Sequence, residues 1–217
     1  MMRTIRGIIK ACMPNLVIQR RLPLWKTRKG NSLLLTFDDG PDEKMTPDVL
    51  NTLKNNDVRA MFFLVGYRAE KYPHIVRQIV GGGHKIGNHS YAHYNDRVPG
   101  YSEYRGDILK CQEVIRNITG VEPRYFRPPR GIISLPSLLA PRSIGLRNIF
   151  WSLEGGEWGK NRQAGINFII QSIVCSAKNR DILLLHDDHS SVTDILNGIL
   201  PALREKNIDL NGGIDCI

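Results

Sequence analysis

The chain has 217 residues, of which 41% are apolar and 24% charged, a composition typical of one globular domain. It excludes a disordered chain, a collagen-like repeat and a small disulfide-stabilised protein. The formal net charge is +9, and this charge is unevenly distributed. Residues 1–29 contain eight basic side chains and no acid, whereas residues 30–217 contain 22 basic and 21 acidic side chains. Because the excess charge belongs to an N-terminal arm and not to a face of the fold, a nucleic-acid-binding protein is disfavoured.

The arm combines apolar and basic residues at helical spacing. Drawn as a helix, it places six apolar side chains on one face and three basic ones beside them. The apolar residues are Ile5, Ile8, Ile9, Cys12, Met13 and Leu16, and the basic residues are Arg3, Arg6 and Lys10. Such a segment fits peripheral binding to an anionic membrane. It fits equally well a terminal helix that docks on the domain and covers the bottom of a barrel.

The absence of a signal-peptide pattern, the lack of a long apolar run and the spacing of the cysteines favour a cytoplasmic location. Lys10 and Pro14 interrupt the only candidate core of a signal peptide, and no apolar run approaches the roughly 20 residues of a membrane span. The four cysteines are far apart and form no CxxC pair, which favours reduced thiols over disulfides. These cysteines are Cys12, Cys111, Cys175 and Cys216. We therefore expect a cytoplasmic protein, with peripheral contact at the inner face of the cell membrane through residues 1–29.

From residue 30 onward, short apolar runs alternate with stretches of helical spacing. Strands are expected at residues 32–37, 60–65, 85–88, 125–126, 146–151 and 181–185. The first helix is expected to begin at Thr46, which would cap it, and the second to end at about Val80. Further helices are expected over 101–118 and near 136–143, 162–177 and 191–206. Six or seven βα units in series predict a parallel sheet or a (β/α) barrel. In such folds, catalytic residues gather at the carboxyl ends of the strands.

Polar clusters follow the predicted strands. Asp38 and Asp39 end the first strand, in a sequence that by itself is also typical of a solvated turn. His89 and His93 follow another strand and are four residues apart, so on one helical turn both could reach one metal ion. Ser90 stands where an HExxH motif has its glutamate, so a general base must come from elsewhere in the chain.

Two further clusters complete the pattern. Arg127 lies in the run FRPPRG, where prolines and a glycine fix the chain and would let the guanidinium clamp a carboxylate by two hydrogen bonds. His186 ends the strand run LLLH and is suited to proton transfer near neutral pH. Each cluster alone is weak, but four of them at strand ends predict one site at one edge of the sheet.

The runs TFDDGP, HSYAH, FRPPRG, WSLEGGEW and LLLHD, in this order, resemble the five motifs of the polysaccharide deacetylases, carbohydrate esterase family 4 with the NodB homology domain. The resemblance covers about residues 30–210 and divides the chain into a basic arm, 1–29, and a catalytic domain, 30–217. It implies an α/β fold, a distorted (β/α) barrel of about seven parallel strands. It also implies metal-dependent removal of N-acetyl groups from amino sugars.

The resemblance also implies roles for individual residues. Asp39, His89 and His93 would bind a divalent metal, first of all Zn²⁺, with Co²⁺ or another divalent ion as alternatives. Asp38 would be the general base, oriented by Arg127. His186 would protonate the departing sugar amine, and Glu154 would pair with this histidine and keep it protonated.

On the substrate side, Leu184 and Trp158 match positions that line the acetate pocket, and the backbone N–H of Arg130 matches a donor to the oxyanion. Two departures from the family pattern stand out. Glu154 and Glu157 occupy positions where aspartates are more common, which affects the tuning of the catalytic histidine. Arg130 replaces a common aromatic residue, which indicates either an anionic substrate group, such as a phosphate, or merely a solvated loop arginine.

We therefore expect an N-deacetylase that acts on an amino sugar within an oligosaccharide, a polysaccharide or a lipid-linked glycan intermediate. One alternative is a deformylase or another hydrolase of non-peptide C–N bonds with a small or lipid-linked substrate. Another is an inactive glycan-binding module. The presence of Asp38, Asp39 and His186 together favours the deacetylase over both. We expect Asp188 to be structural or solvent-facing.

Overall fold

The computed structural model describes residues 20–23, 31–95, 97–158 and 165–217. The predicted amphipathic helix of the arm and the start of the predicted helix 162–177 lie outside these residues. Seven parallel strands form a curled sheet in the order β6-β5-β4-β3-β2-β8-β7. They are β2 (Leu34–Asp38), β3 (Met61–Leu64), β4 (Lys85–Asn88), β5 (Tyr125–Phe126), β6 (Arg147–Asn148), β7 (Leu153–Glu154) and β8 (Ile182–His186). The expected distorted (β/α) barrel of about seven strands is confirmed.

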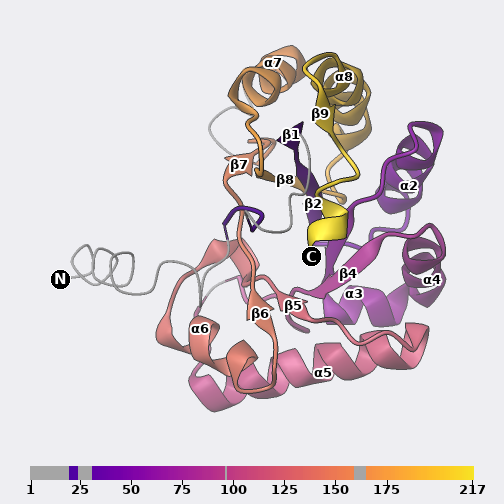
Figure 1. Ribbon diagram of the computed structural model, residues 1–217. Coiled ribbons are helices and arrows are strands. Elements are labelled where there is room, and N and C mark those ends of the chain that lie inside the picture. The colour runs from indigo at the N-terminus through magenta and orange to yellow at the C-terminus, as the bar shows by residue number, and fades with distance from the viewer. Residues whose placement is uncertain (1–19, 24–30, 96, 159–164) are drawn as a thin grey trace.

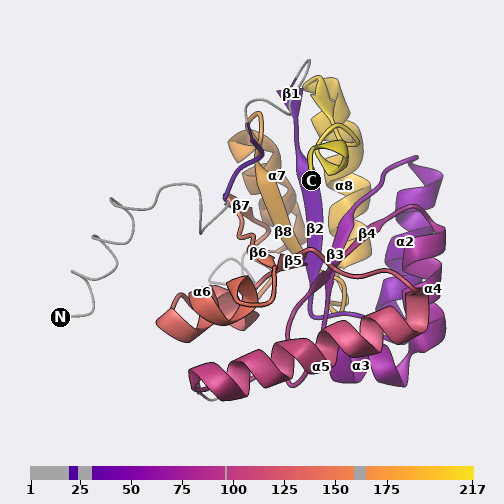
Figure 2. The same ribbon diagram turned by 60° about the horizontal axis from the view of Figure 1, so that its bottom comes forward.

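Helices surround the curled sheet (Figures 1 and 2). In Figure 1, α7 and α8 lie at the top, α2 and α4 at the right, and α5 along the bottom. The helices are α2 (Met45–Asn55), α3 (Gly66–Lys71), α4 (Pro73–Gly81), α5 (Tyr101–Thr119), α6 (Leu135–Arg142), α7 (Ile166–Ser176) and α8 (Val192–Glu205), with the short turns η1 (Pro129–Gly131) and η3 (Ile214–Cys216). A separate pair of short strands, β1 (Asn31–Ser32) and β9 (Ile208–Asp209), completes the fold. Among these described helices, none has the length and apolar character needed to cross a bilayer.

The strands are apolar on both faces because each face packs against a different core. On β2, Leu35 and Phe37 join the large core beneath the helices, whereas Leu34 joins a smaller core on the inner side of the curl. Side chains alternate along a strand, so Thr36 and Asp38 share the inner face with Leu34. The same alternation gives the inner face of the sheet its polar groups at the carboxyl ends of the strands.

The inner core is closed by segments from both ends of the described chain. Leu22 is fully buried there together with Ile214 and Cys216. The N–H of Leu22 donates to the carbonyl of Arg180 at 2.9 Å, and Arg21 forms an ion pair with Asp181 at 3.3 Å. Residues 20–23, which belong to the predicted arm, therefore pack against the folded domain.

Three local expectations differ from the structure. The helix expected after the second strand is divided into α3 and α4, because Pro73 starts a new helix and disfavours helical backbone at the residue before it. Thr46 lies inside α2 and does not cap it; the carboxylate of Asp42 accepts the N–H groups of Lys44 and Met45 at 2.9 Å instead. The strand expected over 146–151 is reduced to two residues, and β7 is an additional strand that no apolar run predicts.

Candidate active site

The predicted polar clusters meet at one edge of the sheet. Asp38 ends β2, His186 ends β8, and the two residues are directly paired in the parallel register of these strands. His89 follows β4 and Arg127 follows β5. A cleft of about 700 Å³ opens at this edge, and Arg127 lies buried beneath it. The other predicted site residues all line the cleft: Asp38, Asp39, His89, His93, Arg130, Glu154, Trp158, Leu184 and His186.

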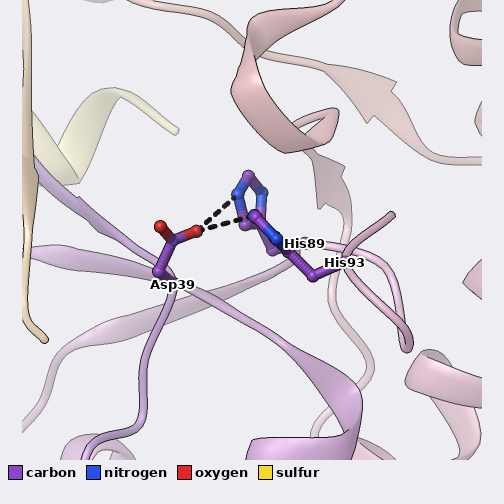
Figure 3. A group of neighbouring side chains, drawn as sticks. All are labelled: Asp39, His89 and His93. Atoms are coloured by element: carbon purple, nitrogen blue, oxygen red, sulfur yellow. Dashed lines mark ion pairs between the residues drawn. The ribbon is translucent and has the colours of Figure 1, made fainter. Parts of the chain in front are cut away.

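Asp39, His89 and His93 converge on one point (Figure 3). Nε2 of His89 lies 3.2 Å and Nε2 of His93 lies 2.9 Å from the same oxygen of Asp39. The other ring nitrogen of His89, Nδ1, lies 2.7 Å from the carbonyl oxygen of Arg127. A proton on Nδ1 donates to that carbonyl and leaves the lone pair of Nε2 directed at the common point.

This group fits a divalent metal ion. Two imidazoles and one carboxylate are a ligand set that zinc accepts, and their ligand atoms lie within 4.8 Å of one another. Within the described part of the chain, the buried Nε2 of His93 has no hydrogen-bond partner at an acceptable angle. Burial alone would raise the pKa of the Asp39 carboxyl, but the two histidines outweigh burial and hold this pKa well below its usual range. The carboxylate is thus charged and ready to bind a cation.

The two histidines lie on a loop and not on a helical turn as expected. Ser90 and His93 have φ angles of 67° and 46°, which no α-helix contains. The loop is held by a partly buried carboxylate that sequence reasoning missed. The carboxylate of Asp107 on α5 accepts the N–H groups of Tyr91 at 2.9 Å and Ala92 at 3.0 Å. No local pattern links Asp107 to this loop, because the contact depends on the packing of α5.

Arg127 positions the Asp38 carboxylate from within the barrel. Both side chains are buried, and Nη1 of Arg127 donates to Oδ1 of Asp38 at 2.7 Å and to the hydroxyl of Thr36 at 2.9 Å. The guanidinium stacks over the ring of Phe63 at 4.1 Å and donates from Nε and Nη2 to two backbone carbonyls. The expected bidentate clamp is therefore a single hydrogen bond within a larger network. Burial lowers the pKa of Arg127, and the charge of Asp38 opposes this shift.

The partner of His186 is Glu157, and the expectation that Glu154 pairs with this histidine is wrong. Oε1 of Glu157 lies 3.0 Å from Nδ1 of His186 and accepts its backbone N–H at 2.8 Å. Glu157 is fully buried, whereas Glu154 ends β7 with an exposed side chain on the wall of the cleft. Between the two glutamates, Gly156 has a φ of 81°, and a Cβ at Gly155 would clash with the carboxylate of Glu157.

The substrate side of the cleft combines apolar and basic groups. Leu184 lies on the inner face of β8 and is buried, and the ring of Trp158 stands edge-on to His186 at 6.3 Å. Arg130 is exposed, has a φ of 58°, and donates a hydrogen bond from its guanidinium to the carbonyl of Asn95. This contact holds the arginine at the mouth of the cleft.

Sequence reasoning missed a charged pair in the same cleft. Arg68 at the start of α3 donates to Asp188 at 2.9 Å, and both residues line the cleft. Asp188 thus lines the cleft, and its ion pair with Arg68 fits the expectation of a structural acid. Arg68 carries no signal in the sequence, because it belongs to none of the five motifs and reaches the cleft only through the packing of α3.

Comparison with known proteins identifies the family of the chain. The family model for polysaccharide deacetylase matches residues 26–149, and the chain belongs to this family. It is 35% identical over 176 residues to a peptidoglycan-N-acetylglucosamine deacetylase of Bacillus cereus, covering 79% of this chain and 63% of that protein. It is 34% identical over 201 residues to a chitooligosaccharide deacetylase of Azorhizobium caulinodans, covering 85% of this chain and 93% of that protein. A family 4 carbohydrate esterase from Streptomyces lividans, solved in complex with acetate, superposes with a TM-score of 0.75 at 30% identity. The match covers 82% of this chain and 90% of that chain.

Proposed function

We propose that this protein is a metal-dependent N-deacetylase of amino sugars within an oligosaccharide, a polysaccharide or a lipid-linked glycan. The observation that carries the proposal is the pairing of Asp38 with His186 across β2 and β8, beside the group of Asp39, His89 and His93. A base, an acid and a ligand set for a cation thus share one cleft. The names of the relatives from Bacillus cereus and Azorhizobium caulinodans support glycans as substrates.

The proposed reaction assigns a separate task to each residue. Asp39, His89 and His93 would hold a divalent ion, with Zn²⁺ as the first choice; when bound, such an ion supplies Lewis-acid chemistry toward water and an acetamide carbonyl. Asp38 accepts a proton from the attacking water, and the hydrogen bond from Arg127 to its Oδ1 leaves Oδ2 for this transfer.

His186 completes proton transfer. Its Nδ1 is engaged by Glu157, so Nε2 is the nitrogen that donates a proton to the departing amine. Leu184 and Trp158 form the apolar wall that receives the acetyl methyl group. The backbone N–H of Arg130 donates to the developing oxyanion, while its guanidinium at the mouth of the cleft favours a substrate with an anionic group nearby.

Acetate release tests this function. The full chain is incubated with N-acetylglucosamine oligomers and with nucleotide-linked and lipid-linked N-acetyl sugars, with and without chelator. We expect acetate from at least one of these substrates, loss of activity with chelator, and recovery on addition of Zn²⁺ or Co²⁺. Failure to release acetate from any of them, with metal restored, would exclude the deacetylase.

For the basic arm we propose a role in location. Residues 1–29 would bring a cytoplasmic enzyme to the anionic inner face of the membrane, where a lipid-linked substrate would lie. The test compares the full chain with the variant Arg3→Gln, Arg6→Gln, Lys10→Gln in sedimentation with anionic vesicles. We expect the wild type to sediment and the variant to remain largely in solution. Equal sedimentation of both would contradict this role.

A further inference from the structure

A buried acid beside the active site has no task in the proposed reaction. Asp187 follows His186 at the end of β8 and is 1% exposed. Its backbone N–H donates to the carbonyl of Asp38 at 3.4 Å, and its carboxylate accepts the hydroxyl proton of Thr46 at 2.5 Å. Asp187 therefore contacts both β2, which ends at Asp38, and the first turn of α2, which contains Thr46.

The hydrogen bonds continue into the loop that carries Asp39. The hydroxyl of Thr46, while donating to Asp187, accepts the N–H of Asp42 at 2.8 Å. The carboxylate of Asp187 also lies against Gly40, since a Cβ added there would clash with it. Val65, which directly follows β3, donates its N–H to the carbonyl of Gly40 at 2.9 Å. The segment between Asp39 and α2 is thus held at successive points.

The conformation of Asp39 shows why the loop needs this support. Its φ is 73°, in the left-handed region, which costs a non-glycine residue some strain even though aspartate adopts it more often than most. This backbone turns the Asp39 carboxylate toward His89 and His93, with which it forms ion-pair contacts at 3.2 and 2.9 Å. A relaxed loop would move the carboxylate away from the two imidazoles.

Asp187 is costly to bury, which argues against an incidental role. In the described part of the chain its Oδ1 has no hydrogen-bond partner, although the atom is buried. Burial raises the pKa of Asp187 to about 7. Burying a carboxyl group with one unpaired oxygen destabilises the fold. The presence of such a group therefore calls for a role that outweighs this cost.

We infer that Asp187 is a positioning residue that, through Thr46 and Gly40, holds Asp39 in the geometry needed to bind the metal ion. The inference rests on the proposed function only for the role of Asp39 as a ligand. Residues that orient metal ligands typically change metal affinity by about 10–100-fold when they are removed.

Zinc titration of the full chain tests the inference. The variants Asp187→Ala and Thr46→Val, after removal of metal, are titrated with Zn²⁺ against a chromophoric chelator. We expect both to bind Zn²⁺ at least about tenfold more weakly than the wild type. Asp187→Asn and Thr46→Ser keep the hydrogen bond, so we expect them to retain affinity within about threefold. If Asp187→Ala fails to fold, the difference in Zn²⁺ affinity between Thr46→Val and Thr46→Ser still tests the inference.

Asp181 provides a matched control. It is also a buried aspartate, 2% exposed, but lies before β8 at the opposite end of that strand from Asp187. Its carboxylate accepts the hydroxyl of Ser152 and the N–H of Lys178. We expect Asp181→Ala to lower the melting temperature while the Zn²⁺ affinity stays unchanged. A purely structural role for Asp187 predicts the same result for Asp187→Ala, and that result would overturn the inference.

The titration separates this inference from the proposed reaction. If the wild type binds Zn²⁺ but releases no acetate from any glycan, the proposed function fails while the affinities of the variants still test Asp187. If acetate is released, we expect Thr46→Val to lower kcat with KM within about twofold, because the cleft walls are unchanged. Zn²⁺ affinities of Thr46→Val and Asp187→Ala equal to that of the wild type would overturn the inference whatever the activity.

Discussion

Nδ1 of His186 lies 3.0 Å from Oε1 of Glu157, and this same oxygen accepts the backbone N–H of His186 at 2.8 Å. Burial alone would lower the pKa of His186, but Glu157 and the nearby Asp38 outweigh burial and raise the pKa to about 9. The imidazole is therefore protonated at neutral pH, as a proton donor to the leaving amine must be. Activity that depends on this proton decreases as the pH rises through about 9.

The first prediction concerns this pair. Glu157→Gln removes the negative charge but keeps an acceptor, so the pKa of His186 decreases toward 6.5, the ordinary value of a histidine. We expect the alkaline limb of the kcat/KM profile to move from about pH 9 to lower pH by about one to two units. Glu154→Gln is the matched control and leaves the limb in place. An unchanged limb in Glu157→Gln would show that Glu157 does not tune the acid.

The second prediction concerns the base. Asp38→Asn preserves the shape of the side chain and its contact with Arg127 but cannot accept a proton. We expect kcat to decrease by about 10²–10⁴-fold while the affinity for Zn²⁺ changes little. Acetate release and Zn²⁺ titration on the same preparation measure the two effects. Undiminished turnover would remove Asp38 as the base.

The third prediction concerns metal binding. His89→Ala removes one of the three groups that face the common point, so we expect loss of stoichiometric Zn²⁺ binding and of acetate release together. His84→Ala is a suitable control, because His84 is buried against Ala60 away from the cleft. Zn²⁺ binding by His89→Ala with wild-type affinity would contradict the assigned ligand set.

The fourth prediction concerns stability. Arg127→Met leaves the buried Asp38 without its guanidinium partner, and breaking a buried ion pair typically costs about 3–5 kcal/mol in the free energy of unfolding. Urea denaturation measures this loss. The exposed Arg130→Met should cost less than about 0.5 kcal/mol. We expect the double variant Arg127→Met, Asp38→Asn to be more stable than Arg127→Met alone, since it removes the unpaired charge; an equal or lower stability would contradict the pairing argument.

The fifth prediction concerns acid sensitivity. Burial and the charge of Arg59 lower the pKa of His84 to about 4, from an ordinary value of 6.5. Between these values the unfolded chain binds a proton that the folded chain does not, so stability decreases as the pH falls from 6.5 to about 4. We expect His84→Gln to reduce this decrease by about 2 kcal/mol, measured by urea denaturation at the two pH values. The exposed His74→Gln should not change it; identical pH profiles for His84→Gln and the wild type would contradict the prediction.

The sequence pattern by itself determined a series of parallel βα units with the motif residues at one edge, and the family resemblance added the distorted barrel. Local apolar runs define most of the strands, and right-handed parallel βα units bring all carboxyl ends to one side. Residues that end or directly follow those strands, such as Asp38, His89 and His186, are therefore placed together by topology alone. Their spacing along the chain is sufficient because strand and helix boundaries are local properties.

Only the tertiary structure decided which groups support these residues. Glu154 and Glu157 lie three residues apart in one motif, and the folded structure places the buried Glu157, not the exposed Glu154, against His186. Asp187 likewise gains its role from Thr46, which is 141 residues away along the chain. Such contacts depend on the curl of the sheet and the packing of helices on it, and distances of a few ångströms between remote segments leave no periodic pattern in a single sequence.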